Sequence, residues 1–176
     1  TNWTYQQEPD SIVWVVRSDG VLTGMTYQRG ENVVAWHRHI LGGAFSGGDA
    51  VVESVAAISN STASSKGEDT LYMIVKRTIN GGTKRYIEYL QPFDFGSNIE
   101  DAWFLDSGLL YSGGATTSLS GLDHLEGQTV SILANGATHA DKVVSSGAIT
   151  LDRSATKVIV GLKYTSKLQT MRIESA

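Results

Sequence analysis

The 176-residue chain has no cysteine and only 2 prolines. The absence of cysteine excludes a disulfide framework and a thiolate metal site. No apolar run approaches the roughly 20 residues of a membrane-spanning helix, so we expect no membrane span. No stretch keeps the i, i+3, i+4, i+7 apolar pattern of an amphipathic helix for three turns. Helices should therefore be scarce.

Charged residues are also few, at 18%, and acids outnumber bases to give a net charge of −4. This balance argues against an extended surface for nucleic acid or for anionic membranes. Glycine and apolar residues are plentiful instead, with 19 glycines and an apolar content of 41%. The composition predicts a sizeable core and a chain with many turns.

Three short apolar runs near the start of the chain predict a three-stranded antiparallel meander. Their valine, isoleucine, tyrosine and tryptophan residues suit a pleated sheet, and Asp19-Gly20 suits a tight hairpin turn. The expected strands are Ile12–Val16, Val21–Tyr27 and Val33–Trp36. The preceding Thr1–Asp10 is mostly polar, and we interpret it as the end of an earlier element that Pro9 closes.

A second meander is expected about 40 residues further on, which is the spacing of propeller blades. Asn80-Gly81-Gly82 is its hairpin turn, while Ile40–Asp49 and Asn60–Glu68 are expected to be loops. The first of these loops is rich in glycine but lacks a phosphate-binding pattern. The expected strands are Ala50–Ser59, Asp69–Arg77 and Thr83–Leu90, followed by a further strand at Leu109–Gly113.

After Ala115 the chain reads as short strands with turns at Glu126-Gly127, Asn135-Gly136 and Ser146-Gly147. The expected core positions there are Val130, Ile132, Val143, Ile149 and Leu151. The predicted fold class is therefore all-β: propeller-like antiparallel meanders followed by a small β-barrel or β-sandwich. The predicted domains are residues 1–113, with about two blades, and residues 114–176.

Two histidines are candidates for a metal site. Alternation along the strand places His37 and His39 on one face and Trp36 on the other. No third ligand lies nearby in the sequence, because Asp49 and Glu53 follow a glycine-rich loop. We therefore predict no metal at this pair and expect both imidazoles to hydrogen-bond to neighbouring backbone.

Acidic residues offer two candidate catalytic sets. Glu53 and Glu88 lie within strands, but arginine partners that tie neighbouring strands together explain them better, because a half-buried charge needs a partner. The candidate arginines are Arg17, Arg38, Arg77 and Arg85. The second set lies among aromatic residues and suits a glycosidase or a calcium site, although a turn-rich connection with solvated acids is favoured. Its members are Asp94, Glu100, Asp101 and Asp106. We thus predict no catalytic, cofactor-binding or metal-binding residue and no cofactor.

Several motifs, spread from Gln7 to Glu174, resemble large virion proteins of tailed bacteriophages and prophages, some of them tail-hub, nozzle or stabilisation proteins. The motifs are Q-x-E-P-D-S-I-x-W-V-V-R-x-D-G, M-T-Y-Q-R, V-V-A-W-H-R-H, V-E-S-V-A-A-I, R-x-I-N-G, R-Y-I-E, G-L-D-H-L-E-G-Q-T-V-S-I-L-A-N-G, G-A-I-T-L and V-G-L-x-Y. Asn135 stands where the family pattern suggests Asp, and both residues make the same turn. The resemblance supplies no catalytic residues.

The resemblance implies a non-enzymatic structural component of a tail, made in the cytoplasm of the bacterial host and placed in the virion. Its partners would be other phage structural proteins, copies of itself in a homo-oligomer, and DNA in a channel without sequence specificity. Because such proteins are longer and Thr1 is not Met, we expect this chain to be a central fragment. Blades cut from a ring should then self-associate through uncovered edges and apolar faces.

Two other function classes remain open. A receptor- or glycan-binding module would use exposed tryptophans as sugar platforms, and the four candidates are Trp3, Trp14, Trp36 and Trp103. A polysaccharide-degrading hydrolase would use a carboxylate pair between Asp94 and Asp106. Solvent exposure of the tryptophans separates the first alternative from a structural protein.

Overall fold

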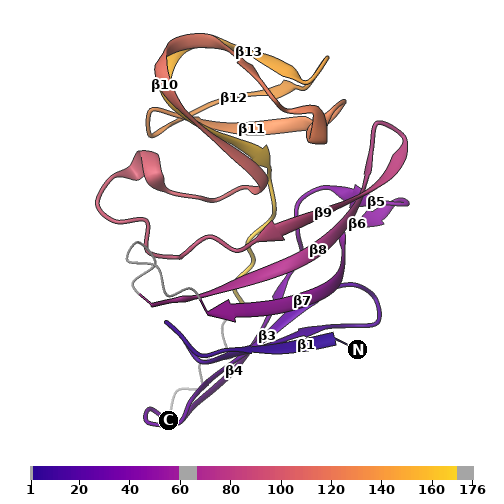
Figure 1. Ribbon diagram of the computed structural model, residues 1–176, viewed down its shortest axis with the longest axis vertical. Helices are drawn as coiled ribbons and strands as arrows, with labels where there is room; N and C mark the ends of the chain where they lie inside the picture. Colours follow the sequence, from indigo (N-terminus) through magenta and orange to yellow (C-terminus); the bar gives the residue numbers. More distant parts are fainter. Residues whose placement is uncertain (1, 60–66, 170–176) are drawn as a thin grey trace, which may run out of the picture.

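The computed structural model describes residues 2–59 and 67–169 and shows an all-β chain (Figure 1). Within these ranges there are 13 strands, and the two helices are single 3-10 turns, Ile99–Asp101 (η1) and Asp123–Leu125 (η2). Every strand pairing is antiparallel. The all-β prediction is confirmed. The loop expected at Asn60–Glu68 lies mostly outside the described residues.

The first sheet has four strands in the order β1-β2-β3-β4. They are β1 (Asn2–Gln6), β2 (Ile12–Val16), β3 (Leu22–Gln28) and β4 (Val33–His39). The predicted meander is present, but the interpretation of the first residues was wrong, because β1 pairs with β2 along its whole length. Its polar side chains have a structural use. Asn2 Oδ1 and Thr4 Oγ1 accept hydrogen bonds from the backbone N–H groups of Val55 and Ala57, on the edge of the next sheet.

The second sheet repeats the meander with three strands in the order β7-β8-β9. They are β7 (Val51–Ser59), β8 (Asp69–Ile79) and β9 (Gly82–Tyr89), and a short hairpin of β5 (Ala44–Phe45) and β6 (Gly48–Asp49) precedes them. The predicted turn between β8 and β9 has positive φ at Asn80 (47°) and Gly81 (72°). That is the backbone of a tight type I′ hairpin, which Asn-Gly favours.

The first two sheets pack face to face over one apolar core, as in a β-sandwich. Trp14 on β2 is its largest member, and its indole N–H donates to Gln6 Oε1 at 2.8 Å. The amide of Gln6 in turn donates to the backbone oxygen of Asp69 at 2.9 Å, which fastens β1 to β8. The core consists of Trp14, Val16, Leu22, Ala50, Val52, Val55, Leu71, Met73 and Val75.

The third sheet lies beyond the sandwich, in orange and yellow in Figure 1, and its strand order is β10-β13-β11-β12. Its strands are β10 (Asp106–Ser120), β11 (Thr129–Ala134), β12 (Ala137–Val143) and β13 (Ala148–Leu162). Its core is separate from that of the sandwich and includes four of the five predicted positions. Val143 was wrongly predicted: it is 61% exposed, and its neighbour Val144 is buried instead. The chain leaves β12 there, so the alternation ends one residue earlier than the pattern suggested.

Within the described residues, the ladders of the third sheet do not close into a barrel, because β10 and β12 remain its two outer strands. The boundary expected between residues 113 and 114 falls inside β10, whose first half already pairs with β13 through Leu110 and Ile159. The division into two domains and the membership of the meanders in a propeller stay predictions.

Candidate interaction surface

The outward side of the first sheet is apolar and aromatic. Side chains directly opposite each other in a sheet share a face, so the register Tyr5–Val13–Met25–Trp36 forms one row across all four strands. A second row runs Trp3–Val15–Thr23–Arg38, and Tyr27 with Val34 starts a third. Trp14 and its row project to the opposite side, into the core. We call this outer side the aromatic face: Trp3, Tyr5, Val13, Val15, Thr23, Met25, Tyr27, Val34, Trp36 and Arg38.

Much of the aromatic face is open to solvent. Trp3 and Trp36 are each 65% exposed, Val34 58%, Tyr5 47% and Tyr27 46%. Arg38 is the one charged residue at the outward positions of these four strands. An exposed, contiguous apolar patch is typical of interaction sites, because single exposed apolar residues are ordinary but clusters are not.

The outer side of the second sheet has a different character. Glu53 accepts two hydrogen bonds from Arg85, at 2.7 and 3.1 Å, and lies 3.1 Å from Lys76. The hydrogen bonds of Arg85 and then of Lys76 lower the pKa of Glu53. Apolar side chains accompany this charged cluster, and Ile87 is 76% exposed. The sandwich therefore has one charged residue, Arg38, on the aromatic face and three linked charged residues on the outer side of the second sheet.

Two of the predicted arginines pair with the candidate glutamates, and the expected link between neighbouring strands is confirmed for Arg77 of β8 with Glu88 of β9. Arg85 pairs with Glu53 on the outer side of the second sheet, and Arg77 pairs with Glu88 on the inner side. Because consecutive strand positions alternate between sides, Glu53 and Glu88 point away from each other. The structure does not bring these two carboxylates together as an acid–base pair. Arg17, in the first hairpin, pairs with Asp19 at 2.7 Å.

A joint centred on Arg77 and Gly42 connects the sandwich to the third sheet. The fully buried side chain of Arg77 donates from Nε to the backbone oxygen of Gly42 at 2.7 Å and from both terminal nitrogens to Glu88. The N–H of Gly42 donates to Asp106 at the start of β10, at 2.6 Å. Burial raises the pKa of Asp106, and the hydrogen bond from Gly42 opposes that rise. Each charge has a partner from another segment, which is the arrangement of a structural joint.

A cleft of about 720 Å³ lies beside this joint, between β9 and the third sheet. Its lining includes Tyr86, Trp103, His124 and Tyr164, together with Glu88 and Asp106 of the joint. Trp103 is half-buried and donates from its indole to the backbone oxygen of Leu105 at 3.0 Å.

The structure holds the four acids of the second candidate set at three separate places. Asp94 accepts from the N–H of Gly96 at 2.9 Å, in a local turn. Glu100 and Asp101 both pair with Lys157 on β13, and the hydrogen bond that Lys157 donates to Asp101 lowers the pKa of Asp101. Asp106 belongs to the joint described above. The set therefore serves to hold the connecting segment in place.

His37 and His39 lie on the same inward face, as predicted. The Nδ1 of His37 and the Nε2 of His39 are 2.7 Å apart and share a hydrogen bond, and Thr26 Oγ1 lies 3.2 Å from the other nitrogen of His37. The backbone partners expected for them were therefore wrong. Burial, and then the charge on His37, lowers the pKa of His39 to about 4. Both rings rest on Trp14, with centroids 5.5 and 5.1 Å away.

The described residues contain no group of three or more histidine, aspartate or glutamate side chains placed to hold a metal. No helix in the described part of the chain has the length and hydropathy to cross a membrane. The prediction of a metal-free histidine pair is left to titration.

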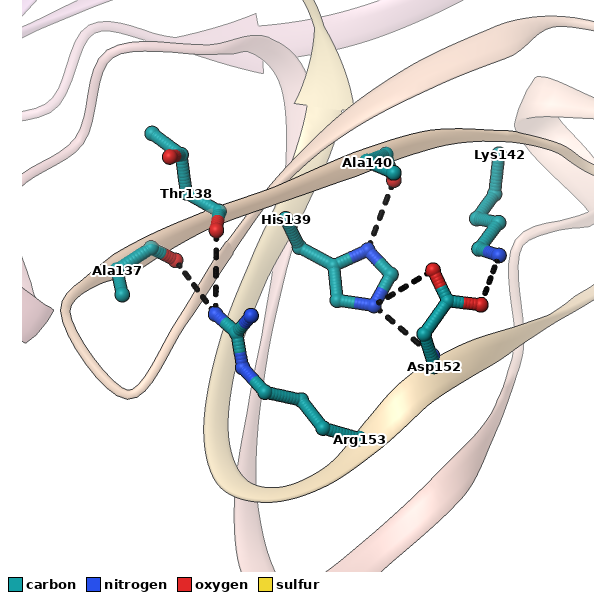
Figure 2. A network of polar contacts seen from close by, with 7 residues as sticks. All are labelled: Ala137, Thr138, His139, Ala140, Lys142, Asp152 and Arg153. Atoms are coloured by element: carbon teal, nitrogen blue, oxygen red, sulfur yellow. Dashed lines mark hydrogen bonds and ion pairs between the residues drawn. The ribbon is translucent and has the colours of Figure 1, made fainter.

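Sequence reasoning missed a polar network around His139, which is shown in Figure 2. The imidazole is 1% exposed; its Nδ1 lies 2.8 Å from the oxygen of Ala140, and its Nε2 accepts from the N–H of Asp152 at 2.9 Å. Asp152 also pairs with Lys142, and Arg153 donates to the backbone oxygens before the histidine. These bonds join β12 to β13 where no ladder does. His139 stands in a polar stretch with no apolar alternation, so nothing local signals its burial.

The aromatic face and the cleft are thus two surfaces, within the described residues, at which several aromatic side chains lie together. No protein-family model matches the chain, and no curated protein matches it either.

Proposed function

We propose that the chain is a non-enzymatic structural component of a phage or prophage tail that works by protein–protein assembly. The observation that carries this proposal is the aromatic face. Interface cores are enriched in tryptophan, tyrosine, methionine and arginine and depleted of lysine, aspartate and glutamate. The outward positions of β1 to β4 have that composition, with two tryptophans, two tyrosines, one methionine and one arginine and no acid or lysine.

Other features support an assembly role. The candidate acids Glu53, Glu88, Asp101 and Asp106 each have a cationic or backbone N–H partner, as structural pairs do. The virion motifs extend over both the sandwich and the third sheet, and they point to other tail proteins and further copies of the chain as partners in the virion. A net charge of −4 suits a wall past which DNA moves, because it offers little counterion release to retain DNA.

The test is incorporation into particles. Mass spectrometry of purified particles should detect this chain, and a Trp36→Glu variant should be depleted from them. Phe93→Glu is the matched control, since Phe93 is an aromatic residue that is 94% exposed and lies away from the aromatic face. Equal incorporation of both variants, or particles that lack the chain, would contradict the proposal.

A receptor- or glycan-binding module is the second candidate, because Trp3 and Trp36 are exposed as that function requires. Between them lie Val13, Val15, Met25 and Thr23, and the one hydroxyl among these, that of Thr23, is buried and does not reach sugar hydroxyls. A ligand site needs a few converging polar groups as well as an apolar surface. Quenching of tryptophan fluorescence by oligosaccharides of the host surface, lost in Trp36→Glu, would favour this alternative.

A further inference from the structure

We infer that the aromatic face binds the same face of a second copy of this chain, forming a dimer with two-fold symmetry. The inference rests on the proposed assembly function and names its first partner. Three observations support a copy of the chain as the occupant: the area of the face, its polarity, and the sizes of its side chains.

The exposed area reaches the range of stable interfaces. The four aromatic side chains are 46% to 65% exposed, and Val34 is 58% exposed. With 150–250 Å² for a whole aromatic side chain, these five residues offer about 500 Å² per copy, or about 1,000 Å² in a pair. Specific interfaces begin at about this total, so the face suffices for a reversible dimer without a further contact.

Polarity favours self-pairing over stacking on the other outer face. Head-to-tail stacking would place the aromatic face on the side that carries Glu53, Lys76 and Arg85. Covering that cluster would remove three charges from water, with a desolvation penalty that their mutual attraction offsets only in part. Self-pairing covers apolar rows with apolar rows. Arg38 lies on the outer strand β4, where its long side chain can extend to solvent at the rim.

Side-chain sizes make the face complementary to itself. The outer strands carry the large residues, Trp3 and Tyr5 on β1 and Trp36 on β4. In the rows of Trp3 and Trp36, the two strands between them carry smaller side chains outward: Val13 and Val15 on β2, and Thr23 and Met25 on β3. The face is therefore a shallow trough between two ridges. With the two sheets crossed at an angle, the Trp3 and Trp36 ridges of each copy run across the trough of the other, where a desolvated tryptophan contributes most to affinity.

The test is sedimentation velocity of the whole chain over a concentration series. A reversible monomer–dimer equilibrium is expected, and Trp36→Lys should raise its Kd by roughly 30-fold or more. Ile87→Lys is the matched control, because Ile87 is also an apolar strand residue, 76% exposed, but lies on the second sheet. The Kd of the Ile87→Lys dimer should equal that of the unmodified chain. Trp3→Lys repeats the test on the opposite ridge, and circular dichroism checks that each variant is folded.

Cross-linking gives a second readout that does not depend on removing a ring. Because the chain has no cysteine, a single Val34→Cys substitution gives each copy one thiol. A short bis-maleimide should join two such copies but not two copies with Ile87→Cys. A monomer at every concentration overturns the inference, as does a dimer that survives Trp36→Lys and Trp3→Lys. If the chain is monomeric while Trp36→Glu is still depleted from particles, the dimer is wrong and the assembly function stands.

Discussion

Acid should destabilise this protein in a pH range set by His39. The lowered pKa of about 4 reflects burial against Trp14 and the neighbouring His37, whereas an exposed histidine titrates near 6.5. In the unfolded chain the imidazole takes up a proton below that value, and in the folded chain it does so only near 4. The contribution of neutral His39 to the free energy of unfolding is therefore fully present above about pH 6.5, and it is lost as the pH falls toward 4.

The magnitude follows from the separation of the two pKa values. A separation of about 2.5 pH units corresponds to about 3 kcal/mol, of which about 2 kcal/mol is lost by pH 5. His37, whose pKa burial also lowers, acts in the same direction. Asp106 acts in the opposite direction, because its pKa is raised and protonation relieves its burial. Ion pairs such as Asp101 with Lys157 begin to fail only at lower pH, since the pKa of the Asp101 carboxyl is lowered.

Urea denaturation at pH 7.5 and pH 5 measures this loss. The free energy of unfolding should fall by about 2 kcal/mol in the native sequence and by much less in His39→Gln. His124→Gln is the control, because His124 lies outside the pair and contacts the backbone oxygen of Ser107. Nuclear magnetic resonance titration of the His39 ring reports its pKa directly. A midpoint near 6.5, or an unchanged loss of stability in His39→Gln, would refute the reasoning.

Four further predictions concern stability and binding. A side chain at Gly24 would place its Cβ 2.2 Å from a ring carbon of His37. Gly24→Ala should therefore lower the free energy of unfolding, measured by urea titration, by about 1–3 kcal/mol. Gly30 has open space around it, so Gly30→Ala should be nearly neutral in the same titration. Arg77→Met should lower the free energy of unfolding by about 3–5 kcal/mol, because it leaves the Glu88 carboxylate without its partner. Calorimetric titration of the unmodified chain with zinc should show no stoichiometric binding at His37 and His39. Two shortened chains, one beginning at Ala115 and one at residue 104, should both unfold cooperatively when followed by circular dichroism. The longer chain should unfold at a higher denaturant concentration, because it keeps the whole of β10. If the longer chain is unfolded, the separate C-terminal unit is disproved.

Local signals predicted much of this fold. The turn residues Asn80, Asn135 and Ser146 all have positive φ, as their Asn-Gly and Ser-Gly dipeptides suggested. Alternation also placed His37 and His39 together, opposite Trp36. Each of these predictions depends on a few neighbouring residues, which is the range over which sequence pattern is informative.

The features that the sequence did not show depend on residues far apart in the chain. β1 looked like the end of an earlier element because Asn2 and Thr4 are polar, yet both accept hydrogen bonds from residues 53 positions away. His139 gave no signal because its partner Asp152 lies on another strand. A polar residue that satisfies a distant backbone group has the same local pattern as one that faces water.

Prediction from local sequence pattern has the same limit for the apolar residues of the aromatic face. Trp14 and Trp36 each lie in a strand with an alternating pattern, and alternation assigns each to one side of the sheet. It does not say which side is covered. Trp14 is 2% exposed because β7 and β8 pack over it, while Trp36 is 65% exposed on the other side of the same sheet. A sheet with apolar residues on both sides needs a layer on both sides, and the described residues supply one. The dimer proposed above supplies that second layer, so sedimentation of the whole chain and of Trp36→Lys tests this argument directly.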